Sequence, residues 1–278
     1  MSKKPSVFTA EYWRDEGGAE GSMLRSVFLA LVTASVIMLT VDFADMWQRS
    51  NGAGGDSERT EPVVFEPLKD TDQERPYYPK AMPLLPGSQP PQMPGVPAKT
   101  TPAMVAARMA FTLDEASGNV SAVGRIEPGT AVDFDKFLKE ANGKAKRIWL
   151  YSSGGSVADA MTMGQSIRRA KLGTMVGENA YCASSCPLMF MGGVERGASR
   201  KAIVGVHQVY TLPAEVGTLH EGLANAQRIS ANCQEYLVEM GVDPRAWIKA
   251  MKTSKNSLYI FTPKELEEFK LITGKAAA

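Results

Sequence analysis

Hydrophobic and polar positions divide the chain into an apolar N-terminal run, a proline-rich middle segment, and a C-terminal part with the periodicities of helices and strands. The uncharged run covers residues 26–41, between Arg25 and Asp42. Apolar neighbours on both sides extend it to the roughly 20 residues that cross a bilayer as a helix. We therefore expect a membrane anchor over residues 26–45, preceded by a polar leader over residues 1–25.

Two other interpretations of this run are a cleaved signal peptide and a buried core helix. The long polar leader and the lack of a small-x-small cleavage site favour an uncleaved anchor. Basic residues are more frequent before the run than after it, which places the leader in the cytoplasm. They are Lys3, Lys4, Arg14 and Arg25 before it, against Arg49 and Arg59 after it. The remainder of the chain is then expected in the periplasm of a Gram-negative cell.

The middle segment is dominated by proline. Eleven of the 17 prolines fall between Pro62 and Pro102. Such a density does not sustain a helix or a central strand. We predict an extended, largely disordered tether over residues 46–102, with a proline-rich ligand for a partner module as the alternative. The folded domain is expected over residues 103–278.

Within this domain, apolar positions alternate between strand and helix spacing, which favours an α/β fold with a mostly parallel sheet. We expect a hairpin from residues 105–113 and 120–126. The predicted helices cover residues 130–141, 157–171, 218–240 and 263–268, with a further helix beginning at residue 187. The predicted strands cover residues 147–151, 172–176, 202–206 and 258–261.

Charge and composition exclude some classes of function. The formal net charge is +1 and no run of Lys and Arg occurs, which argues against a nucleic-acid partner. Two histidines and scattered cysteines lack metal-ligand spacing, so we expect no metal and no cofactor. The three cysteines leave their pairing open. Cys182 bridges Cys186, or one of these bridges Cys233, or all three are buried thiols.

Three short motifs carry the candidate chemistry. Gly154 and Gly155 follow an apolar strand, Ser184 lies in a small-residue turn before a helix, and His207 ends the next strand. A nucleophilic serine, a histidine base and free backbone N–H groups are the parts that serine acyl transfer requires. The expected oxyanion donors are the N–H groups of Gly155 and Ser185. No such use is expected for His220.

Two other assignments of this site are possible. Ser185 is the rival nucleophile; we favour Ser184 because the small Cys186 lies two positions after it, whereas Pro187 lies two after Ser185. Lys201 is the rival base, in a Ser/Lys arrangement.

These motifs resemble a known family. The segments GGSVADAMTMGQSI, CASSCPLMFMGG, VGVHQ and TPKELEEFKLI, which begin at residues 154, 182, 204 and 262, are similar to the proteolytic subunit of Clp protease. The wider ClpP/crotonase superfamily also includes peptidases of the signal peptide peptidase A type. The likeness is strongest to membrane-anchored or periplasmic ClpP-like proteins of undefined role, and it covers about residues 103–273.

The resemblance implies a fold of repeated ββα units and a role for each matching residue. Ser184 corresponds to the nucleophile and His207 to the general base, and the amides of Gly155 and Ser185 correspond to the oxyanion donors. It also implies a peptide or protein substrate and assembly into a homo-oligomer.

The chain departs from the family pattern at three places. Ser153 stands where a proline usually precedes the glycine pair, and Cys186 stands where a glycine usually follows the nucleophile. The acidic third member of the triad has no counterpart before the last helix. Asn256 is expected in its place, to orient the imidazole, with Ser257 as the alternative.

We therefore predict a membrane-anchored serine hydrolase, a ClpP-like peptidase that acts through an acyl-enzyme in the periplasm. Because an imidazolium without a carboxylate is less stabilised, the alternative is a ClpP-like scaffold or binding protein with little or no activity. A third hypothesis is acyl-thioester chemistry of the crotonase type. It is disfavoured because that chemistry has no use for the Ser/His pair.

Overall fold

The computed structural model describes residues 19–57, 59–66, 72–81, 83–96, 99–209 and 219–274. Its contacts form two compact units, Met1–Asp56 and Ser57–Ala278. Each unit is described by itself.

The first unit is built on one long helix, α1 (Ala19–Ser57). Its segment Ser22–Ala44 is apolar and its side chains are exposed. At 1.5 Å per residue, 23 helical residues extend about 35 Å, slightly more than the hydrocarbon core of a bilayer. The segment is thus long and apolar enough to cross a membrane, and its exposure is not that of a core helix.

The second unit contains a five-stranded sheet in the order β4-β5-β6-β7-β9. All neighbouring pairs are parallel except the β4–β5 hairpin. The strands are β4 (Ala110–Asp114), β5 (Asn119–Val123), β6 (Arg147–Tyr151), β7 (Gly173–Val176) and β9 (Arg196–Ala198). The predicted hairpin and mostly parallel sheet are confirmed.

A four-stranded sheet has the order β2-β11-β10-β8. β10 is parallel to β8, and β11 is antiparallel to both β10 and β2. The strands are β2 (Glu74–Pro76), β8 (Tyr181–Ala183), β10 (Ile203–Val206) and β11 (Ser257–Ile260). An isolated bridge between Ser152 and Cys182 connects the end of β6 to β8. Two short strands, β1 (Val63–Val64) and β3 (Pro83–Leu84), pair separately.

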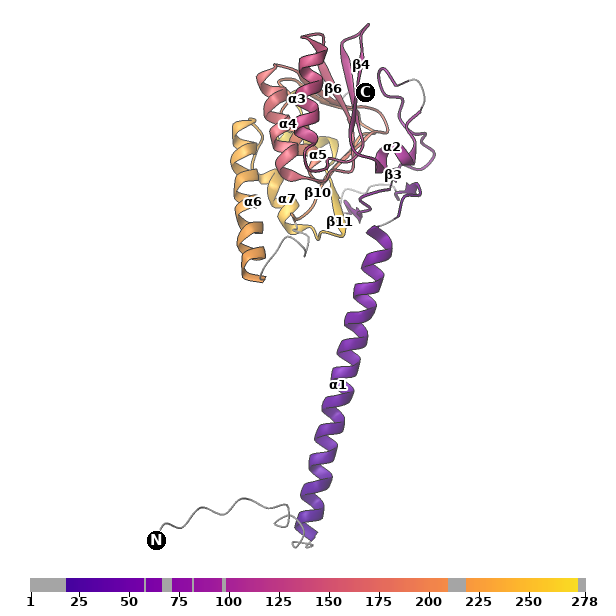
Figure 1. Cartoon of the computed structure of the whole chain (residues 1–278), viewed down its shortest axis with the longest axis vertical. Coiled ribbons are helices and arrows are strands. Elements are labelled where there is room, and N and C mark those ends of the chain that lie inside the picture. Colours follow the sequence, from indigo (N-terminus) through magenta and orange to yellow (C-terminus); the bar gives the residue numbers. More distant parts are fainter. Residues whose placement is uncertain are drawn as a thin grey trace, which may run out of the picture. The chain divides into compact units, whose positions relative to one another are not determined.

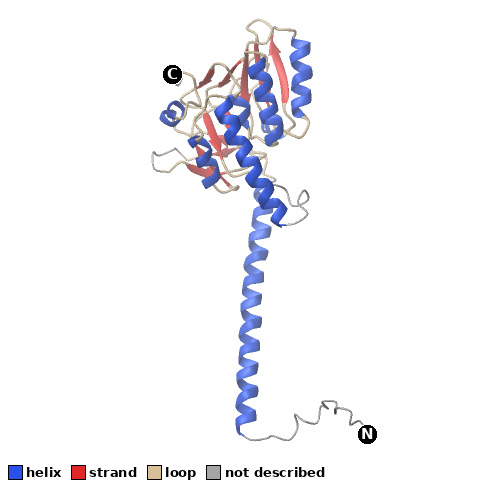
Figure 2. Ribbon diagram, turned by 90° about the vertical axis from the view of Figure 1, so that its left-hand side faces the viewer, coloured by secondary structure: helices blue, strands red, loops and turns tan. Residues whose placement is uncertain are grey.

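Helices α3, α4 and α6 gather on one side of the strands (Figures 1 and 2). The helices of this unit are α2 (Pro102–Ala106), α3 (Thr130–Ala141), α4 (Val157–Arg169), α5 (Cys186–Met191), α6 (Leu219–Glu239), α7 (Arg245–Lys252) and α8 (Pro263–Glu268). The succession β4-β5-α3, β7-β8-α5 and β9-β10-α6 shows the expected ββα repetition. Every residue of α5 is buried.

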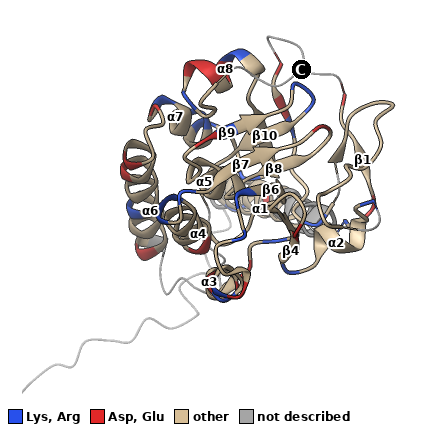
Figure 3. Ribbon diagram, turned by 90° about the horizontal axis from the view of Figure 1, so that it is seen from above, with Lys and Arg blue, Asp and Glu red and all other residues tan. Residues whose placement is uncertain are grey.

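Figure 3 shows acidic and basic residues interspersed on α3, α6 and α8.

Local sequence explains where the helices begin. Ser156 caps α4 by accepting a hydrogen bond from the N–H of Asp159. Thr262 and Glu265 form a capping box at the start of α8, where Pro263 occupies the first turn. The sequence did not predict α7, nor the strands β8 and β9. Both strands have only three residues, too few for a periodicity to be recognised.

The predicted tether over residues 46–102 is corrected by the structure. Its first part belongs to α1, and the described residues from 59 onward form part of the second unit. Apolar side chains of this segment are buried in the core, among them Phe65, Tyr77 and Met93. The prolines are tolerated because the strands here are two or three residues long and β2 is an edge strand. The folded unit thus begins well before residue 103.

Candidate active site

The parallel pairing of β8 and β10 brings the two main candidate residues together. Ala183 is in register with Gly205, so both strands end at the same edge of the sheet. Ser184 directly follows β8, and His207 directly follows β10. The distance between Ser184 Oγ and His207 Nε2 is 2.8 Å. Residues separated by 23 positions in the sequence therefore form a hydrogen-bonded Ser–His pair.

The backbone at Ser184 is held in an unusual conformation. Its φ is 61°, in the left-handed region that residues other than glycine seldom adopt. The N–H of Ser184 donates to the carbonyl of Gly205, and α5 begins two residues later. This sharp strand-to-helix turn, residues 182–187, is called the elbow below. Strained backbone of this kind occurs where surrounding structure fixes it, often at functional sites.

His207 is buried, with 4% of its surface exposed. Burial lowers the pKa of its imidazole from the ordinary 6.5 to about 4, because the charged form is poorly solvated there. The imidazole is therefore neutral at neutral pH, and neutral imidazole is the form that accepts a proton. The Ser184 hydroxyl lies within hydrogen-bond distance of His207 Nε2.

Of the two glycines before α4, Gly154 packs directly against the elbow and Gly155 packs against the backbone of Ile126. Gly154 has a φ of 89° and Gly155 a φ of 141°. A Cβ on Gly154 would lie only 2.8 Å from the backbone nitrogen of Ser185. A Cβ on Gly155 would overlap the carbonyl oxygen of Ile126. Both the dihedral angles and the lack of space require glycine at these two positions.

Two backbone N–H groups remain available beside the Ser–His pair. Within the described part of the chain, neither Gly155 N–H nor Ser185 N–H donates a hydrogen bond. The turn at Gly154 and Gly155 is fixed from the side, since Gly154 N–H donates to Ser152 Oγ at 3.0 Å. Free, fixed amides close to a nucleophile are the requirement for binding an oxyanion.

The hydroxyl of Ser185 is placed differently from that of Ser184. Ser185 is 2% exposed, and among the described residues its Oγ has no hydrogen-bond partner. Lys201 forms an exposed ion pair with Glu178 at 2.7 Å and does not line the cavity at the site. The structure thus pairs Ser184, and not Ser185, with His207. It does not bring Lys201 to the cavity.

The structure does not bring Asn256 to His207. The side chain of Asn256 is exposed, and no hydrogen bond joins it to the imidazole in the described ranges. Its backbone contacts a residue beside the site, because the Asn256 carbonyl accepts a hydrogen bond from Tyr77 N–H at 2.9 Å. Ser257 is paired with Pro76 in the β11–β2 ladder. The sequence-based choice of Asn256 relied on its position before the last helix, and β11 separates it from that helix.

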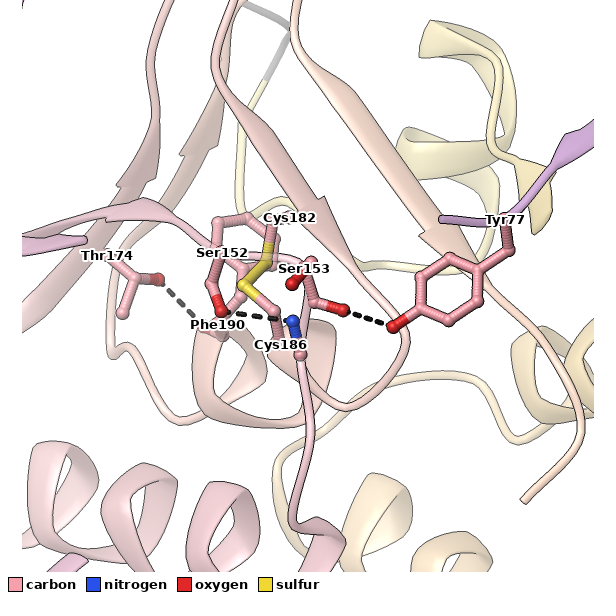
Figure 4. The surroundings of a disulfide bond; sticks show 8 residues. Tyr77, Ser152, Ser153, Thr174, Cys182, Cys186 and Phe190 are labelled. Carbon is pink, nitrogen blue, oxygen red and sulfur yellow. Dashed lines mark hydrogen bonds between the residues drawn. A yellow bond between two sulfur atoms is a disulfide. The ribbon is translucent and has the colours of Figure 1, made fainter. Parts of the chain in front are cut away.

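A segment that the sequence analysis missed completes the site. Residues 72–81, called the strap below, carry Tyr77, whose ring centroid lies 4.4 Å from that of His207. The Tyr77 hydroxyl donates to the carbonyl of Ser153 at 2.6 Å, as Figure 4 shows. One available signal was the aromatic content of this stretch, because disordered segments are poor in aromatic residues.

The elbow is also fixed covalently. Cys182 and Cys186 form a disulfide that encloses Ser184, and it lies beside Ser152 and Ser153 (Figure 4). This resolves the pairing that the sequence left open. Cys233 is a buried free thiol, and burial raises its pKa to about 12. Cys186, which departs from the family pattern, is therefore one end of a cross-link.

A cavity of about 420 Å³ opens at this edge of the sheet. Ser184, His207, Gly155 and Tyr77 line it. Much of the remaining wall is apolar and comes from Val157, Val209, Ile229 and Trp247. In the described ranges, no group of three or more His, Cys, Asp or Glu side chains gathers in a way that suits a metal ion.

Comparison with known proteins gives likeness of fold only. No protein-family model and no curated protein matches the chain. One similar solved structure is a mutant of a membrane-bound stomatin-specific protease, 19% identical, covering 57% of this chain and 77% of that chain, with a TM-score of 0.43. Another is a mutant of ClpP1 from Listeria monocytogenes, 16% identical, covering 59% of this chain and 94% of that chain, with a TM-score of 0.47. At these identities and TM-scores the likeness concerns the fold alone, and activity and site residues are not inferred from it.

Proposed function

We propose that this protein is a serine hydrolase, specifically a peptidase, in which Ser184 is the nucleophile and His207 the general base. The observation that carries the proposal is the 2.8 Å contact between Ser184 Oγ and His207 Nε2. Its support is the setting of that contact, at a strained elbow, beside two free amides and at the wall of a cavity.

The mechanism follows from this geometry. As Ser184 Oγ attacks the carbonyl carbon, its proton passes to His207 Nε2. The oxygen of the tetrahedral intermediate accepts hydrogen bonds from the N–H groups of Gly155 and Ser185. The imidazolium then donates its proton to the leaving amine, which leaves an ester on Ser184. A water molecule, deprotonated by His207, hydrolyses that ester and restores the free serine.

The cavity is lined by the charged residues Arg125 and Glu127 and by several apolar residues, and the apolar part of its wall favours a substrate preference. Val157, Val209 and Ile229 offer no charge to a bound side chain. We therefore propose peptide or protein substrates with an apolar residue next to the cleaved bond, because burying a methylene group in such a pocket gains about 0.8 kcal/mol.

Location and assembly belong to the same proposal. The apolar segment Ser22–Ala44 is proposed to anchor the protein in the cell membrane, with the leader in the cytoplasm and the hydrolase unit in the periplasm. The Cys182–Cys186 disulfide supports an oxidising compartment. By resemblance to the Clp protease subunit, we propose that the protein forms a homo-oligomer.

A second candidate function is a binding or scaffold protein that retains the fold with little turnover. The observation that favours it is the low pKa of His207, about 4, which makes the imidazolium formed during attack costly. Such a protein would bind peptides at the same cavity without releasing products.

Pre-steady-state hydrolysis of a p-nitrophenyl ester by the full chain in detergent micelles separates the two functions. A hydrolase is expected to release p-nitrophenol in a burst equal to the enzyme concentration, because the acyl-enzyme accumulates. Ser184→Ala is expected to abolish the burst, and Ser185→Ala, the matched control, to retain it. Absence of a burst from folded wild-type protein, together with saturable binding of a peptide, would support the scaffold.

A further inference from the structure

We propose that Tyr77 is a positioning residue, which holds the His207 imidazole and the Gly154–Gly155 turn in place for attack by Ser184. This inference rests on the proposed function, because it assigns a role within the same site. It concerns a residue outside the catalytic motifs, in the strap.

The first contact is between rings. The ring centroids of Tyr77 and His207 are 4.4 Å apart and their planes are inclined by 36°. The phenol ring covers part of the imidazole, and both residues are buried, with 8% and 4% of their surfaces exposed. An imidazole packed in this way cannot rotate freely about its side-chain bonds. Its Nε2 is therefore held toward Ser184 Oγ.

The second contact is made by the same side chain. The Tyr77 hydroxyl donates to the carbonyl of Ser153, immediately before the glycine pair. That pair includes Gly155, which lines the cavity and whose N–H donates no hydrogen bond to another described residue. One aromatic side chain thus packs on the imidazole through its ring and bonds to the turn before the glycine pair through its hydroxyl. Figure 4 shows the second of these contacts. A purely apolar filler of the same volume supplies only the first contact.

The strap itself is tied down on both sides of Tyr77. Before it, β2 pairs with β11, from Glu74 opposite Tyr259 to Pro76 opposite Ser257. After it, the carbonyl of Pro79 accepts hydrogen bonds from Arg125 Nη1 and from Ser153 Oγ. Ser153 therefore contacts the strap through both its carbonyl and its hydroxyl. This supplies a use for the serine at a position where the resembled family has a proline.

The test compares Tyr77→Phe and Tyr77→Leu with wild type as full chains in detergent. The readouts are the second-order rate constant for labelling by a fluorophosphonate and the His207 pKa from NMR titration of the imidazole. Tyr77→Leu removes both contacts and is expected to slow labelling on the order of 100-fold, the usual effect of a misplacement of about 1 Å. Tyr77→Phe keeps the ring and is expected to slow labelling about tenfold, through the loss of one buried hydrogen bond.

The NMR readout does not depend on catalysis. Tyr77→Leu admits water to the imidazole, so the His207 pKa is expected to rise from about 4 toward 6.5, whereas Tyr77→Phe leaves it near the wild-type value. Phe65→Leu is the matched control. Phe65 is a buried aromatic of the same N-terminal segment that packs on Tyr181 and does not line the cavity. It is expected to lower stability without changing the labelling rate or the His207 pKa.

The outcomes separate failure of this inference from failure of the proposed function. Wild-type labelling that is unchanged in Tyr77→Phe and Tyr77→Leu overturns the positioning role and leaves the hydrolase intact. Equal slowing in Phe65→Leu also overturns it, because the effect is then one of stability. If wild type does not label, the proposed function fails, and an unmoved His207 pKa in Tyr77→Leu then overturns the positioning role as well. If Tyr77→Leu does not fold, the labelling rate of Tyr77→Phe decides.

Discussion

Two regions of this molecule build the site, and the sequence describes them very differently. The region from residue 152 to residue 207 carries the glycine pair, the elbow and His207, each next to the end of a strand or the start of a helix. The strap, residues 72–81, is proline-rich and contains a single strand of three residues. Yet the ring of Tyr77 packs on the imidazole of His207, with 4.4 Å between their centroids. Motifs locate the reacting atoms, but the contacts that hold them can come from segments without any pattern.

The difference also has a thermodynamic side. In the first region the geometry depends on backbone, namely positive φ angles and glycines in contact with neighbouring carbonyls. In the strap it depends on one aromatic side chain and a few hydrogen bonds. Substitutions that disturb the backbone of the first region are therefore expected to destroy the site. Substitutions in the strap are expected only to loosen it.

The largest effect is expected from Gly155→Ala. The added Cβ meets the Ile126 carbonyl, and the φ of 141° is not available to alanine, so we expect a loss of at least about 3 kcal/mol in the free energy of unfolding and no labelling. The matched control is Gly143→Ala, where φ is 76° and no atom lies within 4 Å of the added Cβ. It is expected to cost only about 1 kcal/mol. Urea denaturation measures both, and equal losses would contradict the role of close packing.

The next effect is a pH dependence that arises from His207. Its folded pKa of about 4 lies below the unfolded value of 6.5, so the unfolded state binds more protons between these values. The contribution of His207 to the free energy of unfolding is fully present above about pH 6.5. It falls by roughly 3 kcal/mol as the pH drops toward 4. The comparison variant is His207→Gln. It keeps the other ionisable residues of the cavity, Arg125 and Glu127, so that a difference between the two proteins comes from His207. Urea denaturation is expected to show a flatter pH profile for that variant, and identical profiles would refute the buried imidazole.

A smaller effect is expected from opening the disulfide. Closing a loop of five residues stabilises by about 2 kcal/mol in the chain-entropy account, so Cys182→Ala combined with Cys186→Ala is expected to lose about that much. Labelling of Ser184 is expected to slow, because the elbow loses its cross-link. Cys233→Ala, which leaves the disulfide in place, serves as the control for removing a buried sulfur. Unchanged labelling in the double variant would show that hydrogen bonds alone fix the elbow.

The smallest effect is expected from Asn256→Ala. The side chain is exposed, and the carbonyl that receives Tyr77 N–H belongs to the backbone and survives the substitution. Labelling is expected to stay within about twofold of wild type, since surface substitutions away from contacts change little. A tenfold loss would restore Asn256 as the residue that orients the imidazole.

The sequence was sufficient for the part of the fold that follows regular patterns. Strand β6 and helices α3 and α8 begin and end at the residues that the sequence predicted. The proximity of Ser184 and His207 followed from a resemblance, and the structure supplies its cause in the β8–β10 register. The strap was not predicted because a high frequency of proline excludes only long helices and central strands. It does not detect a two- or three-residue strand, or one buried tyrosine.

The most direct test of the account is to label the full chain with a fluorophosphonate and locate the adduct by mass spectrometry of its peptides. The account predicts one adduct per chain, on Ser184, which disappears in Ser184→Ala and in His207→Gln and persists in Ser185→Ala. An adduct on Ser185, or no adduct on a wild-type protein shown to be folded, would contradict it.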